Sequence, residues 1–192
     1  MPSNSLNRWN TTRAQALDQI AHAHRRVGGS GRGRRYATEQ INHAYTMLLS
    51  SQFQGFCRDL HSEAVDHIVR SVTPVPLQAV VRADFMLHRK LDSGNPNPSN
   101  IGADFNRLGL RFFDQIRARS RWNIGRIDHL EDLNRWRNAI AHQAFDPAKL
   151  GGIIHLRLAM VKQWRAACEQ LAVVFDDVLG DHVVHIAGVR PW

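Results

Sequence analysis

The residues with the clearest capacity for chemistry lie together in one segment. Arg137 and Asn138 are adjacent, three small or apolar residues follow, and the next residue is His142. An imidazole, with a free pKa near ~6.5, can take or give a proton near neutrality, and a guanidinium can hold phosphoryl oxygens with two donors. Cleavage of RNA by its own 2′-hydroxyl needs both functions, because protons must move and charge on the phosphorane must be stabilised. Arg137 and His142 are therefore candidate catalytic residues, Asn138 is a candidate for orienting the ring or the ribose, and this chemistry requires no metal and no cofactor.

This segment resembles the defining motif of the HEPN superfamily of all-α ribonucleases. That motif is an arginine and a histidine separated by a few residues, often with a polar residue directly after the arginine, and Arg137, Asn138 and His142 match it in its four-residue form. The stretch from Thr46 to Leu60 resembles the first long helix of the prokaryotic families of the RiboL-PSP and MAE types. The order and spacing of the expected helices fit the family over residues 37–179.

The resemblance implies a HEPN-like helical bundle and a metal-independent endoribonuclease that acts as a toxin or as a phage-defence effector on RNA. It also implies a homodimer in which two copies of the motif face one cleft, and an antitoxin protein as a further partner. Members controlled by a nucleotidyltransferase antitoxin often carry a tyrosine two residues after the histidine, where this chain has Ala144. That departure leaves open an antitoxin of another type, or none.

The spacing of the motif poses a geometric problem. At about 100° per residue, Arg137 and His142 lie roughly 140° apart around a helix axis, whereas Asn138 and His142 share one face. Either two copies of the chain complete one site, or the helix ends near His142 and frees its direction. In a purely structural alternative, Arg137 pairs with Asp59 or Glu63, and His142 is stabilised by the helix dipole. If the site is catalytic, Asp59 and Glu63 are candidate supporting residues.

Length and composition indicate what kind of fold must position these residues. The chain has 192 residues, of which 43% are hydrophobic, so one domain with a sizeable core is expected and a wholly disordered chain is excluded. No run of residues is apolar enough to span a membrane, and Met1 to Asn10 lacks the apolar stretch of a secretory signal. Only two cysteines are present, Cys57 and Cys168. These features predict a cytoplasmic protein in a reducing setting.

Apolar residues recur at steps of three and four in five stretches, which predicts an all-α, up-and-down bundle of about five helices. The first expected stretch runs from Thr38 to about Ser71, as one long helix or as two with a kink. The other four cover residues 77–91, 101–116, a segment that starts at Asp128 as N-cap and is closed by Pro147, and 160–178 with Gly180 as C-cap. The expected organisation is a basic, Gly/Arg-rich arm with a short helix over residues 1–36, a helical domain over 37–180 and a tail over 181–192.

The charge favours an anionic partner. The chain has 25 basic and 17 acidic residues, for a net charge of +8, and only three of the basic residues are lysines. With Trp122 and Arg126 nearby, a set of arginines is a candidate RNA-holding surface, or equally a solvated face: Arg107, Arg111, Arg117, Arg119, Arg121 and Arg135. The pairs His22/His24 and His182/His185 are interpreted as surface histidines rather than metal ligands.

Two further functions are left open by the sequence. The fold could be a catalytically inert module that binds RNA, a nucleotide or a partner protein. Alternatively, the net charge and the Arg-Gly stretch from Arg25 to Arg35 could serve duplex DNA, although no helix-turn-helix pattern is present. The inert module differs from the nuclease in whether Arg137 and His142 face an open cleft or are satisfied within the core of one chain. Duplex DNA binding that survives removal of residues 1–35 and outcompetes RNA would favour the DNA-binding alternative.

Overall fold

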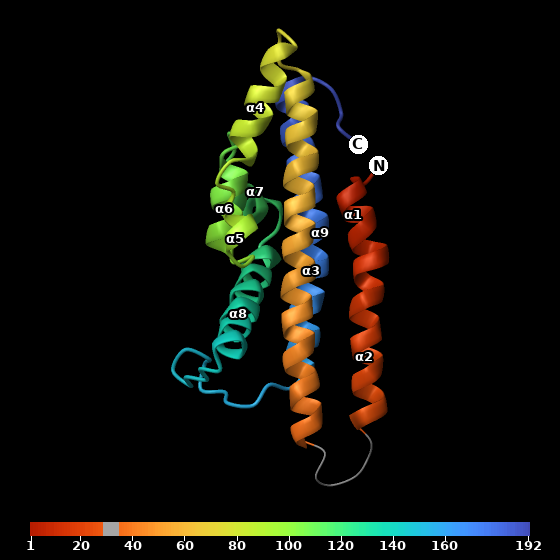
Figure 1. Ribbon diagram of the computed structural model, residues 1–192, viewed down its shortest axis with the longest axis vertical. Coiled ribbons are helices and arrows are strands. Elements are labelled where there is room, and N and C mark those ends of the chain that lie inside the picture. The colour runs from red at the N-terminus through yellow and green to blue at the C-terminus, as the bar shows by residue number, and fades with distance from the viewer. Residues whose placement is uncertain (29–34) are drawn as a thin grey trace.

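The computed structural model describes residues 1–28 and 35–192, and every regular element in those ranges is helical. The all-α prediction is therefore confirmed (Figure 1). The elements are, in chain order, α1 Asn4–Arg8, the π-helical turn η1 Trp9–Arg13, α2 Ala14–Gly28, α3 Arg35–Arg70, α4 Pro76–Met86, α5 Lys90–Ser93, α6 Pro98–Asn106, α7 Phe112–Arg119, α8 Trp122–His142 and α9 Leu158–Ala187. No helix in the described ranges has the length and apolar character needed to cross a lipid bilayer.

Two long helices, α3 and α9, form the spine of the bundle (Figure 1). They run in parallel, because Tyr45 near the start of α3 accepts a hydrogen bond from Arg165 near the start of α9, while Phe53 packs on Phe175 further along both. Helices α2 and α8 run the other way on opposite sides of this pair. The long stretch of chain between α3 and α9 therefore carries α8 along the side of the spine.

The core is the apolar stripe that the spacing of the first expected helix predicts. Tyr45, Phe53, Phe56 and Leu60 recur at steps of three, four and eight along α3 and are fully buried. The ring of Phe175 packs against Phe53 in a tilted contact and against Phe112 edge to face, with ring centroids 5.9 and 4.8 Å apart. The expected helical stretch is thus confirmed, and of its two alternatives the structure shows one continuous helix rather than two with a kink.

The N-terminal segment, expected as a basic arm with a short helix, is helical from Asn4 to Gly28 and packs along α3. Leu6, Trp9 and Leu17 are buried in the core. The sequence pattern did not predict that this segment joins the core, because its apolar residues are few. The turn between α1 and α2 is also π-helical, which shifts the spacing of those residues away from that of an α-helix. Residues 29–34 of the expected Arg-Gly stretch lie outside the described residues.

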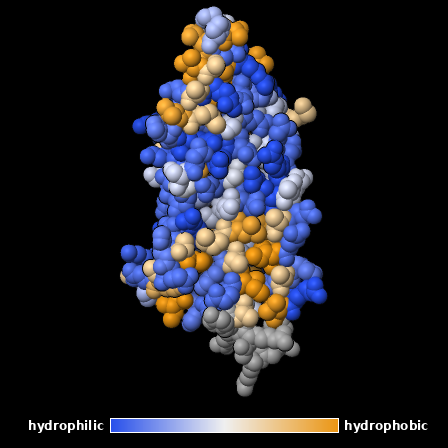
Figure 2. Space-filling view, viewed as in Figure 1, coloured by the Kyte–Doolittle hydropathy of each residue, from blue (hydrophilic) through white to orange (hydrophobic). Residues whose placement is uncertain are grey.

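The five expected helices do not correspond one to one with the observed ones. The expected helix over 101–116 is divided into α6 and α7, because Gly109 adopts a φ of 88° that helical residues avoid. The expected helix over 77–91 likewise ends at Met86, and His88 has a φ of 55°. Helix α4 has no buried residue, and its exposed Val75, Leu77 and Val80 belong to the apolar area at that end of the molecule (Figure 2).

Two predicted helix ends are wrong. Asp128 is not an N-cap, since α8 begins six residues earlier at Trp122. Gly180 does not end the last helix; α9 continues to Ala187, where Gly188 with a φ of 70° provides the left-handed cap. The expected tail over 181–192 is therefore helical for its first part. Gly180 serves packing instead, because a Cβ there would lie 3.3 Å from the Trp192 indole nitrogen.

Candidate functional site

The motif residues occupy the last turns of α8. The helix remains regular through His142 and ends in a Schellman pattern, in which Ala144 N–H donates to Ala139 and Gln143 takes a left-handed φ of 52°. His142 therefore keeps its helical direction, and the offset of roughly 140° from Arg137 stands. Asn138 and His142 are exposed and Arg137 is half-buried, so the motif faces solvent rather than the core.

A chain of hydrogen bonds fixes Asn138. Its side-chain oxygen accepts from Asn95 Nδ2 at 2.9 Å and from Arg137 Nη1 at 3.2 Å. Asn95 is held in turn by Asn97 Nδ2 at 2.6 Å. The loop that carries them is attached to α8 by Asn134, whose amide donates to the Pro96 carbonyl at 3.1 Å. Both acceptor positions of Asn138 are occupied, and the amide can therefore act only as a donor toward a ligand.

Asn95 and Asn97 are site residues that the sequence analysis missed. The segment lies between the expected helices over 77–91 and 101–116, and nothing in its spacing relates it to a helix some 40 residues later. The one local signal is Asn97 ahead of Pro98, which is typical of a helix start, and Asn97 does cap α6 by accepting from Asn100 N–H at 2.8 Å.

Arg137 differs from its neighbours in charge balance. Arg135, on the same helix, donates to Glu131 at 3.3 Å and to Asp132 at 3.0 Å. In the described part of the chain, no carboxylate lies within ion-pair distance of Arg137 or of His142. The half-buried guanidinium of Arg137 is therefore held by a neutral amide and keeps an uncompensated positive charge.

Asp59 and Glu63 are not part of this arrangement. Asp59 pairs with Arg8 at 3.0 Å and with Arg13 at 2.8 Å. Glu63 accepts hydrogen bonds from the Asn4 and Ser5 amides at 2.9 Å and so caps α1. Helix α1 lies on the opposite side of the spine from α8 (Figure 1). Both the expected supporting role and the expected pairing with Arg137 are therefore replaced by contacts with the N-terminal segment.

The candidate RNA-holding arginines are spread over α6, α7 and α8, and most of them have acidic partners. Arg111 and Arg117 both approach Asp114, at 3.6 and 3.4 Å. Arg119 pairs with Asp181, and Arg107 donates to backbone carbonyls before α5 and lies 3.9 Å from Asp84. Exposed pairs of this kind are weak and screened, so phosphate can replace the carboxylates.

Arg121 is the exception in this set. Its guanidinium lies 5.0 Å from the ring centroid of Trp122, whose side chain is 66% exposed. The pair presents a cation and an aromatic face to solvent at the start of α8, a combination that suits an unpaired base.

The histidine pairs show no metal-binding geometry. Among the described residues, no group of three or more His, Cys, Asp or Glu side chains could hold a metal ion. His182 instead forms a 2.8 Å hydrogen bond with the Leu108 carbonyl.

Comparison with known proteins adds no relatives. No protein-family model matches the chain, and neither a curated protein nor a solved structure is significantly similar to it.

Proposed function

We propose that this protein is a metal-independent endoribonuclease of the HEPN type. Arg137 stabilises the phosphorane, His142 moves protons, and Asn138 positions the ribose or the ring. The 2′-oxygen of the substrate attacks the adjacent phosphorus, the bond to the 5′-oxygen breaks, and a proton passes from the attacking to the leaving oxygen through imidazole. The products are a 2′,3′-cyclic phosphate and a 5′-hydroxyl.

One observation carries this proposal, namely the uncompensated charge of Arg137 beside an exposed histidine. A half-buried guanidinium without a carboxylate is unfavourable for folding alone, and such groups concentrate at functional sites. The neighbouring Arg135 has two acidic partners, so Arg137 differs in charge balance from the arginine two positions before it. Phosphate is the anion that a planar guanidinium binds best.

The site is proposed to be completed by a second copy of the chain. Because α8 stays helical through His142, one chain directs Arg137 and His142 to different sides. A two-fold axis beside the ends of two α8 helices lets Arg137 of one protomer and His142 of its partner address one phosphate. RNA is the substrate, and a role as a toxin or defence effector, with or without an antitoxin, follows from the family resemblance.

The experiment is cleavage of labelled single-stranded RNA in EDTA by the wild-type protein and by His142→Ala. The matched control is His185→Ala, which removes an equally exposed histidine from α9. Cleavage that resists EDTA, disappears in His142→Ala and persists in His185→Ala is the expected result. Binding without cleavage by all three proteins would instead favour an inert RNA-binding module, and preference for duplex DNA would favour the DNA-binding alternative.

A further inference from the structure

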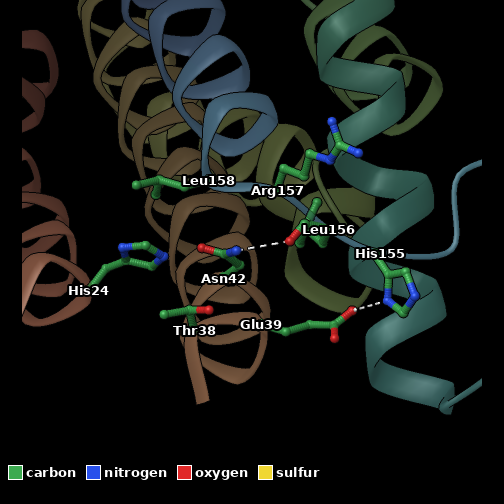
Figure 3. A pocket seen from close by; sticks show the side chains of 8 residues that line it. All are labelled: His24, Thr38, Glu39, Asn42, His155, Leu156, Arg157 and Leu158. Atoms are coloured by element: carbon green, nitrogen blue, oxygen red, sulfur yellow. Dashed lines mark hydrogen bonds and ion pairs between the residues drawn. The ribbon is translucent and has the colours of Figure 1, made fainter. Parts of the chain in front are cut away.

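A cavity of about 510 Å³ lies where α2, the start of α3 and the segment leading into α9 meet (Figure 3). His24 comes from α2, Glu39 and Asn42 come from α3, and His155 and Arg157 come from the segment before α9. A volume of this size accommodates a small organic ligand such as one nucleoside.

Asn42 is the buried polar residue of this cavity. The residue is 4% exposed, and its amide nitrogen donates to the Leu156 carbonyl at 2.8 Å. Its oxygen Oδ1 has no hydrogen-bond partner among the described residues. Figure 3 shows that oxygen directed toward the ring of His24, which covers it. Burial and the nearby Lys162 lower the pKa of His24, so the ring is neutral near pH 7 and can turn aside without moving a charge.

Glu39 supplies a second acceptor. One carboxylate oxygen lies 3.1 Å from His155 Nδ1, but the side chain of His155 is 73% exposed. An exposed pair of this kind is weak, so a ligand that donates hydrogen bonds can replace His155. Figure 3 shows this carboxylate on the His155 side and Asn42 Oδ1 on the His24 side, so Glu39 is the acceptor that a ligand beside His155 meets.

The Glu39 carboxylate and a nearby cation define the chemistry of the ligand. Exocyclic amino groups of nucleobases are the donors that carboxylates and amide oxygens bind in nucleic-acid recognition. The side chain of Arg157 makes no hydrogen bond or ion pair with the described residues, and it lies on the same side of α3 as His155 (Figure 3). It can hold the phosphate that belongs to such a base.

The start of α3, which lines the cavity, lies toward the end of the molecule where α8 ends (Figure 1). His43, which follows Asn42, stacks on Phe145 with ring centroids 5.4 Å apart. Phe145 follows His142 by three residues, so their Cα atoms lie within about 11 Å of each other. A few nucleotides of single-stranded RNA can bridge the motif and the cavity.

We propose that this cavity binds one unpaired base of the RNA, of the kind that carries an exocyclic amino group. The cavity thereby gives the enzyme a preference for adenine or cytosine over uracil near the cleaved bond. This inference rests on the proposed function, because it takes RNA as the ligand.

The test measures binding separately from cleavage. Fluorescence anisotropy follows fluorescein-labelled A8, C8 and U8 oligonucleotides bound to the His142→Ala protein. We expect A8 and C8 to bind about tenfold more tightly than U8, because the Glu39 carboxylate accepts from the amino group that uracil lacks. Glu39→Gln, added to His142→Ala, should reduce that preference to less than about threefold. His155→Ala should preserve it, because the carboxylate remains, and so should Gln40→Ala, a control on the exposed side of the same turn.

Equal binding of A8 and U8, no binding at all, or a preference that survives Glu39→Gln would overturn the inference. The EDTA-resistant cleavage of the wild-type protein is read independently, so a failure of the base pocket is distinguishable from a failure of the nuclease proposal. Thermal melting of each variant confirms that the comparison is between folded proteins.

Discussion

Two arginines two positions apart on α8 differ in what neutralises them, and this difference is testable. Arg135 has two acidic partners, whereas Arg137 is held only by the Asn138 amide. We expect Arg137→Ala to lower RNA cleavage by roughly 10² to 10³, the usual effect of removing one donor that stabilises transition-state charge. Arg135→Ala should change cleavage by less than about threefold, because its charge is already compensated.

Initial rates on one RNA substrate measure the effects of Arg137→Ala and Arg135→Ala. Equal losses in the two variants would indicate that the arginines contribute only general electrostatic attraction.

His61 predicts how stability depends on pH. It is fully buried on α3, neither ring nitrogen has a hydrogen-bond partner among the described residues, and burial together with Arg89 lowers its pKa to about 4. The unfolded chain, with a pKa near ~6.5, therefore binds the proton first as the pH falls. Between about pH 7.5 and about pH 4.5, this group alone should reduce the free energy of unfolding by about 2.5 kcal/mol.

Urea unfolding at those two pH values tests this prediction with His61→Leu, which removes the titrating group, and His185→Ala as an exposed control. The loss of stability on acidification should be smaller in His61→Leu by about the predicted amount. An unchanged pH dependence would mean that His61 is not the group that titrates.

At the scale of elements, Glu63 connects the N-terminal helix to the spine. It accepts from two backbone amides of the first turn of α1 and from the Ser5 hydroxyl at 2.6 Å. We expect Glu63→Ala to lower the free energy of unfolding by about 1 to 3 kcal/mol, because the part-buried donors of Ser5 lose a charged acceptor. Cleavage at low temperature should be unchanged, because Glu63 does not approach the motif. Chemical denaturation with parallel activity assays, and Glu131→Ala as an exposed control on α8, measures both effects. Loss of activity without loss of stability would restore Glu63 to the catalytic site.

The helices differ in how well the sequence predicts them, for physical reasons. The stripe of Tyr45, Phe53 and Leu60 repeats without interruption, so the period alone predicts α3. Helices α6 and α7 are separate because Gly109 has a positive φ. Glycine is compatible with both helical and left-handed backbone, so the sequence alone does not predict the break. Gly180 suggested a helix end, but its lack of a side chain makes room for Trp192, a contact that only the folded chain reveals.

The residues of the candidate site also differ in how well the sequence predicts them. Arg137, Asn138 and His142 are recognisable because their relation is local, and the structure brings Arg137 and Asn138 into direct contact. Asn95 could not be predicted, because its contact with Asn138 depends on how the loop before α6 meets α8. Asp59 and Glu63 were misassigned because the N-terminal segment that binds them carries too few apolar residues to be predicted as part of the bundle.

For the whole molecule, the proposed site predicts subunit complementation. If Arg137 of one protomer and His142 of its partner act on one phosphate, a mixed dimer of Arg137→Ala and His142→Ala contains one intact site. Co-refolding the two inactive variants should restore about a quarter of the wild-type activity, since about half of the dimers are mixed and each has one of two sites. Differently tagged subunits and a pull-down verify that mixed dimers form. Mixed dimers without activity, or a protein that sediments as a monomer while cleaving RNA, would contradict a shared site.

The central claim is that Arg137 and His142 cleave RNA through its own 2′-hydroxyl, and the chemistry of the product ends tests it most directly. Wild-type protein is incubated in EDTA with a 5′-labelled RNA, and the products are analysed by mass spectrometry. We expect a 2′,3′-cyclic phosphate on the upstream fragment and a 5′-hydroxyl on the downstream fragment. A 3′-hydroxyl on the upstream fragment would contradict it, because water rather than the 2′-oxygen would then have attacked the phosphorus.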